Sequence, residues 1–159
     1  MIKGLLVIIP CGKGKIWDTY PTMKQVPAKD AYTGSPFKVN RDYAEKFAEK
    51  WVILSAKYGY ISPETFIEDY DITFKDLRTN PISVSHLKQQ VQERKLNEFP
   101  EIIGLGGIEY RERIRDSFEG TGITIQFPFE NSGGIGKMMS MTKSATVSGK
   151  RVPDNLDNL

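Results

Sequence analysis

The chain has 159 residues, of which 39% are apolar and 26% are charged, and its formal net charge at neutral pH is +2. This length suits one domain with its own core, and the composition argues against a disordered chain. No apolar run approaches the roughly 20 residues that cross a bilayer, and so small a net charge does not by itself indicate a nucleic-acid partner.

The first predicted element is a buried strand at residues 5–9, which is followed by a glycine-rich basic loop. Glycines let the backbone approach a ligand and lysines place positive charge beside it, so Cys11, Gly12 and Lys13 are candidate ligand-binding residues. The loop lacks the GxxxxGK[ST] spacing of a triphosphate site, and a solvated turn is the alternative. Residues 16–33 show no clear period and contain two prolines, which predicts a long ordered loop or lid.

A helix is predicted from Ser35 to about Trp51, with Ser35 as the N-cap and Pro36 at the first helical position. Apolar residues recur at helical spacing through this segment, so one face should pack on a sheet. The free amide groups at its start, around Gly34 and Ser35, would bind an anion if that end faces a ligand crevice. The alternative is that Ser35 only caps the helix.

A short β-branched run at residues 51–54 predicts a buried strand of a parallel sheet. Ligands of open α/β sheets bind at the carboxyl ends of strands, so Ser55 and Lys57, which follow this run, are candidate site residues. Asp69 and Asp71 flank an aromatic ring within loop reach of the lysine. The alternative for these two carboxylates is a surface turn with solvated charges.

The second half of the chain continues the alternation of strands and helices. We expect a helix at 84–98, a strand at 101–105, a helix at 108–118, a strand at 122–127 and a short methionine-bearing helix after Lys137. Gly106 and Gly107 open the helix at 108 in the strand-glycine-helix arrangement of an anion site, and both are candidate ligand-binding residues. Tyr110 lies on the apolar face of that helix and is either core or site.

These elements predict an α/β fold: a single-domain three-layer sandwich whose mostly parallel central sheet is flanked by helices. The domain is expected to span residues 1–143, because the chain shows neither an internal repeat nor a linker. Residues 144–159 lose periodicity and are expected to form a poorly ordered C-terminal tail.

Cysteine and histidine are too few for several kinds of site. Cys11 has no second cysteine to pair with, which with the lack of a targeting signal suggests the cytoplasm. His86 is the one histidine and is expected on the surface, so a zinc site and a Ser/His/Asp triad are not expected. We therefore expect no metal, no cofactor and no membrane partner.

Four segments in order, PCGKGK, AYTGSPF, ILSAKYGYISPETFIEDYDITF and SGGIGK, resemble those of small uncharacterised domains related to the YaaA peroxide-stress and archaeosine-synthase-associated proteins. The resemblance implies a fold similar to uracil-DNA glycosylases and a link to DNA binding, oxidative damage or nucleic-acid base modification. The matching positions are Cys11, Lys13, Tyr32, Gly34, Ser35, Ser55, Lys57, Tyr58, Gly59, Asp69, Tyr70 and Asp71. Gly12 stands where relatives tend to have serine, and the chain is too short for the helical DNA-contacting insertion of YaaA.

The leading hypothesis is a nucleotide- or nucleobase-binding pocket that extends to N-glycosidic or base-modification chemistry on nucleic acid or its precursors. Asp69 or Asp71 would stabilise the oxocarbenium-like charge of the transition state. Lys13 and Lys57 would hold a phosphate. The base would stack on one of three rings, those of Tyr32, Tyr58 and Tyr70.

Two other hypotheses remain open. The first is a non-catalytic DNA- or RNA-binding protein of a stress or damage response, in which basic side chains neutralise phosphates. Those side chains are Lys13, Lys15, Lys57, Arg111, Arg113 and Arg115. The second makes Cys11 a redox sensor, with the lysines of its loop favouring the thiolate, against the alternative of an inert cysteine at a strand end.

Overall fold

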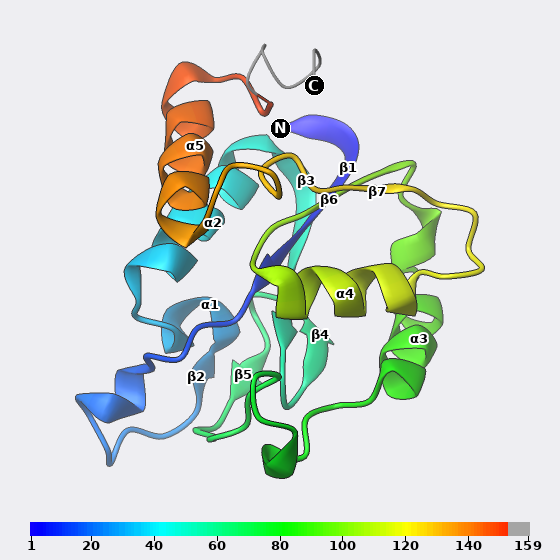
Figure 1. Cartoon of the computed structure of the whole chain (residues 1–159). Coiled ribbons are helices and arrows are strands. Elements are labelled where there is room, and N and C mark those ends of the chain that lie inside the picture. The colour runs from blue at the N-terminus through cyan, green and yellow to red at the C-terminus, as the bar shows by residue number, and fades with distance from the viewer. Residues whose placement is uncertain (153–159) are drawn as a thin grey trace.

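The computed structural model of the chain describes residues 1–152 and shows an α/β fold with a five-stranded, mostly parallel central sheet (Figure 1). In the strand order β4-β3-β1-β6-β7, the bounds are β1 Ile2–Pro10, β3 Ala48–Ser55, β4 Gly59–Ile61, β6 Glu101–Gly104 and β7 Ile125–Gln126. β1 runs parallel to β3 and β6, and β6 runs parallel to β7, whereas the edge strand β4 is antiparallel to β3. The expected α/β class with a mostly parallel sheet is confirmed.

Helices and a small ribbon surround the sheet. The α-helices are α1 Ala28–Ala31, α2 Ser35–Phe47, α3 Val84–Glu93, α4 Ile108–Ser117 and α5 Ile135–Ser148. Three 3-10 turns complete the helical elements: η1 Ile16–Asp18, η2 Leu77–Thr79 and η3 Leu96–Glu98. The ribbon pairs β2 Val26–Pro27 with β5 Phe66–Ile67 in antiparallel fashion.

The central strand β1 supplies apolar side chains to both faces of the sheet. Leu5, Val7 and Ile9 belong to the core that α2 and α5 cover, and Leu6 and Ile8 belong to the core that α3 and α4 cover. All five side chains are fully buried. A strand covered on both faces needs apolar residues at every position, which is why β1 has a continuous apolar run instead of an alternating one.

The direction of the chain across the sheet reverses between β1 and β6. From β1 the chain passes through α2 to β3 on one side, whereas β6, on the other side of β1, leads through α4 to β7 (Figure 1). Such a switch point opens a crevice between the carboxyl ends of the two neighbouring strands, where ligands of α/β proteins bind. Here those ends are Pro10 and Gly104.

The predicted helix after Ser35 is present, but both of its ends differ from the prediction. The N-cap is Gly34, which has no side chain to cap with, and Ser35 is the first helical residue. The helix ends at Phe47, before the predicted Trp51, because residues 48–55 form β3 and pair with β1. Helical periodicity and strand propensity overlap in this segment, and the pairing with β1 decides between them.

Two later elements are shorter than predicted. The helix expected at residues 84–98 ends at Glu93, since Lys95 adopts a left-handed conformation with φ of 58° and starts the separate turn η3. The strand expected at residues 122–127 is paired only at Ile125–Gln126, where it meets β6. Local patterns mark both elements, but tertiary pairing sets where they stop.

Residues 144–152, which the sequence assigned to a C-terminal tail, are described and contact the domain. α5 continues to Ser148, and Ala145 is 3% exposed against the core under α2. Tyr43 Oη donates a hydrogen bond of 2.6 Å to the carbonyl oxygen of Arg151, so the chain beyond the helix also contacts the domain. The remainder of the expected tail, residues 153–159, lies outside the described part of the chain.

The segment at residues 16–33, expected as a long ordered loop or lid, packs against the domain through buried side chains. Trp17 is 5% exposed and its Nε1 donates to the carbonyl oxygen of Met23 at 3.0 Å. Ala28 and Tyr32 are buried at the other end of the segment. Anchors at both ends hold this segment beside the carboxyl edge of the sheet.

Candidate functional site at the carboxyl edge of the sheet

Segments that follow parallel strands meet at one edge of the sheet. Cys11 follows β1, Ser55 is the last residue of β3, and Gly106 comes shortly after β6. These three strands are parallel, so their carboxyl ends lie at the same edge. The amide of Cys11 donates to the carbonyl oxygen of Leu54 at 3.0 Å, which fixes the start of the first loop against β3.

A cluster of tyrosine and serine hydroxyls is buried at this edge. Tyr32 Oη and Tyr70 Oη lie 2.6 Å apart, and Ser55 Oγ donates to Tyr70 Oη at 3.0 Å. Ser55 Oγ also accepts hydrogen bonds from the backbone amides of Lys57 and Tyr58, at 3.2 and 3.1 Å. The ring of Tyr58 packs edge-on against that of Tyr70, with 5.7 Å between centroids. Ser55 thereby links the two buried tyrosines to the turn after β3.

The hydroxyl cluster brings three hydroxyl groups into contact at the edge of the sheet. Ser55 donates its proton to Tyr70, Tyr32 and Tyr70 share one hydrogen bond, and Ser55 is also a hydrogen-bond neighbour of Tyr32. Serine and tyrosine hydroxyls are all donors, so the cluster suits a partner that carries acceptor atoms.

Lys15 adds a buried positive charge to the hydroxyl cluster. The residue is 8% exposed, and its Nζ lies 4.4 Å from the centroid of the Tyr70 ring and donates to the carbonyl oxygen of Lys13 at 3.2 Å. No carboxylate within residues 1–152 lies at ion-pair distance from this ammonium. A buried cation without an anionic partner is costly, and an anionic ligand would compensate it.

The backbone around Lys15 explains why this side chain points inward. Its amide donates to Asp18 Oδ2 at 2.8 Å, which closes the turn η1, and Lys15 forms an isolated β-bridge with Tyr32. The amide of Thr33 donates to the carbonyl oxygen of Gly14 at 3.1 Å and extends that contact. The basic loop is thus fastened to the segment before α2, which places the lysine over the tyrosines.

Cys11 and Tyr110 form a second polar contact beside the hydroxyl cluster. Cys11 Sγ lies 3.3 Å from Tyr110 Oη, which also donates to the carbonyl oxygen of Cys11 at 3.3 Å. Burial first, and the electrostatic effect of Cys11 second, raise the pKa of Tyr32, Tyr70 and Tyr110 above the ordinary value of 10.0. These phenols therefore stay protonated at neutral pH and act as neutral hydrogen-bond donors.

The candidate glycines serve the backbone in different ways. Gly59 has a φ of +77° and Gly106 a φ of +117°, and a Cβ at Gly106 would lie 3.0 Å from the Pro10 ring, so both positions require glycine. Gly34 and Gly107 are the N-caps of α2 and α4. Gly12 has room for a Cβ at ordinary contact distance from Tyr32 and Phe37.

The remaining candidates, Lys13, Ser35, Lys57, Asp69 and Asp71, are exposed and do not join the buried cluster. Lys57 Nζ lies 5.0 Å above the ring of Tyr58, and Asp69 Oδ1 accepts a hydrogen bond from the amide of Tyr70. Asp69 also lines a surface groove of about 630 Å³ together with Trp17 and Phe66. The sequence placed both aspartates within loop reach of Lys57, and within residues 1–152 no ion pair joins Lys57 to either of them.

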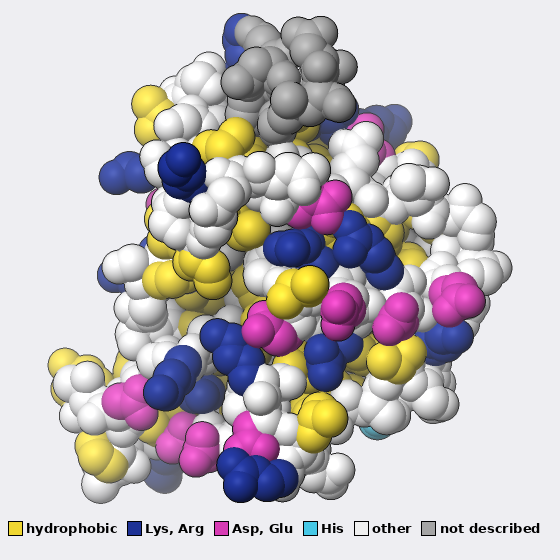
Figure 2. Space-filling view, viewed as in Figure 1, with side chains coloured by type: hydrophobic (Ala, Val, Ile, Leu, Met, Phe, Trp, Pro, Cys, Tyr) yellow, Lys and Arg dark blue, Asp and Glu magenta, His cyan; other side chains and the backbone are white. Residues whose placement is uncertain are grey.

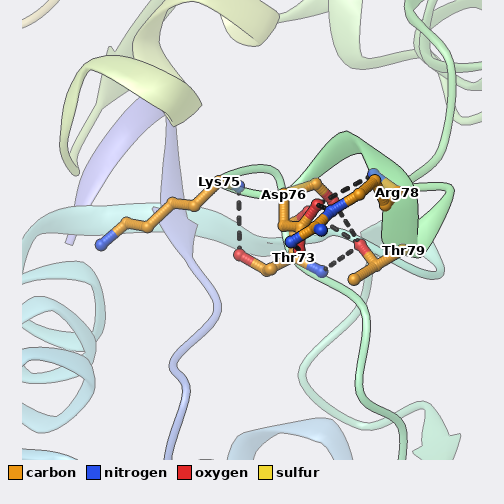
Figure 3. Close-up of polar contacts among 5 residues, drawn as sticks. All are labelled: Thr73, Lys75, Asp76, Arg78 and Thr79. Carbon is orange, nitrogen blue, oxygen red and sulfur yellow. Dashed lines mark hydrogen bonds and ion pairs between the residues drawn. The ribbon is translucent and has the colours of Figure 1, made fainter.

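The segment after Asp71 is a self-contained turn (Figure 3). Thr79 Oγ1 donates to the carbonyl oxygen of Thr73 and accepts from its amide, both at 3.0 Å, and Asp76 binds Arg78. Figure 3 shows the side chain of Lys75 extending away from the other four residues. The polar groups of this turn satisfy one another, which marks it as a structural element.

Two of the three arginines of α4 share a single acid, Glu130. Glu130 Oε2 lies 3.7 Å from Arg111 Nε and 2.5 Å from Arg115, and Arg113 stacks on the ring of Phe74 with 4.4 Å to the centroid. Figure 2 shows Lys and Arg side chains mixed with Asp and Glu side chains over this helix. The mixed charges do not form the continuous positive surface that a phosphate backbone requires.

The sequence assigned two contributors to the site only a secondary role: Lys15 as one of several cations for a nucleic-acid partner, and Tyr110 as either core or site. Lys15 belongs to the basic loop, but no local signal shows that it is buried while Lys13 is exposed. Tyr110 lies on the apolar face of α4, and the GGxxY turn before it was a usable signal. Within residues 1–152 there is no group of three or more His, Cys, Asp and Glu side chains that could hold a metal ion, and no helix there is long and apolar enough to cross a membrane.

The fold and the site together define an α/β protein whose open, mostly parallel sheet carries a buried, donor-rich polar cluster at its carboxyl edge. The chain belongs to the DUF6884 family, a family of unknown function whose model matches residues 6–144. It is 36% identical over 141 residues to the uncharacterized protein YfjM of Bacillus subtilis (strain 168), which covers 88% of this chain and 93% of that protein. No solved structure matches the chain significantly.

Proposed function

We propose that the protein binds a nucleotide or nucleobase at the carboxyl edge of the sheet, over Tyr32, Tyr70 and Lys15. The observation that carries this proposal is the buried ammonium of Lys15, which rests on Tyr70 with no carboxylate within ion-pair distance in residues 1–152. A phosphate or a base carbonyl would supply an acceptor for the ammonium and for the hydroxyl donors beside it.

Aromatic rings and further cations support the same ligand class. Bases stack on aromatic side chains, and the ring of Tyr58 is half-buried beside that of Tyr70. Lys13 and Lys57 are exposed cations in loops that follow β1 and β3, where they could contact a phosphate. The ligand would lie beside the switch point, the usual position in open α/β sheets.

A finer form of the proposal adds N-glycosidic or base-modification chemistry. Breaking an N-glycosidic bond develops positive charge on the sugar, which a carboxylate stabilises. Asp69 and Asp71 flank Tyr70 in sequence, so a movement of this exposed loop over a bound ligand would bring a carboxylate to it. As part of this finer proposal, we also propose that the chain is related to the YaaA-related domains. Its fold would then be a three-layer sandwich similar to that of uracil-DNA glycosylases.

Calorimetric titration with AMP, GMP, CMP, UMP and the free bases tests the proposal. We expect at least one of these ligands to bind, and Lys15→Met to weaken its binding by about tenfold or more, since a charge-assisted hydrogen bond is lost. Lys50→Met is the matched control, because Lys50 is an exposed lysine near the amino end of β3, whereas Ser55 is the last residue at its carboxyl end. Absence of binding at millimolar ligand, or equal binding by Lys15→Met, would refute the proposal.

The same ligands also test the finer proposal, which is that the protein acts on the nucleotide it binds. If a bound nucleotide is turned over, Asp71→Asn should abolish release of the base and leave the binding isotherm unchanged. Full turnover by that variant would remove Asp71 from the mechanism. Binding without turnover of any nucleotide would retain the binding function and reject the enzymatic one.

Lys13 and Lys57 are exposed, and neither has a carboxylate at ion-pair distance in the described chain. These two cations favour nucleic-acid binding as the second candidate function. Phosphate contacts release counterions, so affinity for single-stranded DNA or RNA should fall steeply with salt. Fluorescence anisotropy with a labelled oligonucleotide at 50 and 200 mM salt measures this slope. A flat response would exclude this candidate.

A further inference from the structure

A small pocket lies at the carboxyl end of β6, on the opposite side of β1 from Ser55. Its volume is about 10 Å³, which is close to the space that one water-sized atom occupies. The walls come from α2, α4, α5, the end of β6 and the segment after β7. Its polar lining residues are Asn40, Arg111, Glu130 and Thr142.

Asn40 lines this pocket with a side-chain amide that makes no hydrogen bond in the described chain. The residue is 8% exposed, and no hydrogen bond within residues 1–152 involves its amide group. An asparagine amide can donate two hydrogen bonds and accept two. The amide is therefore available to a polar atom inside the pocket.

Arg111 presents a second unsatisfied donor to the same pocket. Its Nη1 donates to the carbonyl oxygen of Gly106 at 2.9 Å, which holds the guanidinium over the end of β6. Its Nε is buried and makes no hydrogen bond, since Glu130 Oε2 is 3.7 Å away. Two donors from separate helices, α2 and α4, thus converge on one small space.

The local charge decides which kind of atom suits the pocket. Arg111 and Arg115 both pair with Glu130, so these three groups carry a net charge of +1. Thr142 does not add a donor, because its hydroxyl donates to the carbonyl oxygen of Met138. A positive, donor-rich lining favours an acceptor that bears negative charge.

We infer that this pocket binds one oxygen of an oxyanion, either a carboxylate or a phosphate, between Asn40 and Arg111. The rest of the ligand lies at the mouth of the pocket, because only one atom fits inside. The site shares no residue with the Tyr32–Tyr70–Lys15 cluster, so it stands or falls independently of the proposed nucleotide binding.

Side-chain NMR of the arginines reads the pocket directly. In ¹H–¹⁵N spectra, the Nε–H resonance of Arg111 should shift saturably as sodium acetate or sodium phosphate is added at constant ionic strength. The Nε–H resonance of Arg113, which stacks on Phe74 outside the pocket, is the internal control and should stay in place. Saturation by acetate alone assigns a carboxylate, saturation by phosphate alone assigns a phosphate, and saturation by both assigns a general oxyanion site.

Two variants sharpen the test. Asn40→Leu keeps the side-chain volume and removes the amide, so oxyanion affinity should fall by about tenfold. Glu130→Gln removes the competing carboxylate from the partly exposed rim and should raise affinity by at least about fivefold. The second variant keeps the proposal testable if Asn40→Leu does not fold.

A pocket that holds only water gives a different pattern. The Arg111 resonance would then respond to neither anion, and Glu130→Gln would not create a response. Equal movement of the Arg111 and Arg113 resonances would indicate nonspecific contact of the anions with surface arginines. Each of these results would overturn the inference.

Discussion

Ser55 shows how much one buried hydroxyl can organise at the end of a strand. It is fully buried, donates to Tyr70, and accepts from the backbone amides of Lys57 and Tyr58. Ser35, the other candidate serine, is exposed and caps nothing within the described chain. Ser55 therefore has a structural role at the site, whereas Ser35 has no capping role in the described chain.

The serine pair gives a prediction at this scale. Ser55→Ala should lower the free energy of unfolding by about 1–3 kcal/mol, because two partly buried amides lose their acceptor and Tyr70 loses a buried donor. Ser35→Ala is the control and should stay within about 0.5 kcal/mol of the parent chain. Urea denaturation measures both values. An equal, small effect of the two substitutions would contradict the contacts assigned to Ser55.

At the scale of elements, the turn between β3 and β4 depends on Gly59. Its φ of +77° is a left-handed conformation, and a Cβ there would lie 2.1 Å from Gln90 Oε1. Gln90 cannot easily move, since it accepts from the amide of Tyr60 at 2.8 Å and donates to the carbonyl oxygen of Tyr58 at 3.0 Å. Gly59 is thus required where α3 meets β4. This packing explains the glycine at a candidate site position without any ligand contact.

Gly59→Ala should lower the free energy of unfolding by at least about 1–3 kcal/mol from the backbone conformation alone. Gly136→Ala is the matched control, because Gly136 lies in α5 with no atom near the position of a new Cβ. That variant should gain up to about 1 kcal/mol from reduced backbone entropy in the unfolded chain. Thermal unfolding of both variants checks the opposite signs, and a stabilising Gly59→Ala would disprove the assigned clash.

At the scale of the whole molecule, the buried tyrosine phenols make the free energy of unfolding depend on pH in the alkaline range. Burial is the largest cause that raises the pKa of Tyr32, Tyr43, Tyr60, Tyr70 and Tyr110 above 10.0. Above pH 10 the unfolded chain loses these protons and the folded chain keeps them, so the folded state binds more protons. The contribution of these phenols to the free energy of unfolding is therefore fully present below pH 10 and falls as the pH rises further.

The expected loss is about 1.4 kcal/mol per pH unit for each such tyrosine. Tyr60→Phe should make the decline between pH 10 and 11 shallower, even though it lowers stability at neutral pH. Phe118→Leu changes the ring that packs against Tyr60, carries no titrating group, and should leave the slope unchanged. Guanidinium denaturation at a series of pH values gives the slopes, and identical slopes in parent and Tyr60→Phe would contradict the burial argument.

The sequence by itself determined the class of fold and the positions of its main elements. The apolar run at the start of the chain predicts β1, and the glycine pair before Ile108 predicts the start of α4, which begins at that residue. It also pointed to Cys11, Tyr32, Ser55 and Tyr70, which the structure brings to one edge of the sheet. These signals are local, since periodicity and turn chemistry act over a few residues.

Only the tertiary structure decided which polar groups lie buried together. Lys15 is buried over Tyr70 while Asp69 and Asp71 stay exposed, and Asn40 of α2 lines the same pocket as Arg111 of α4. None of these outcomes has a local signal, because they depend on the order of strands in the sheet and on the packing of distant segments. A side chain's lack of a partner is a property of the whole fold, and the proposed sites rest on that property.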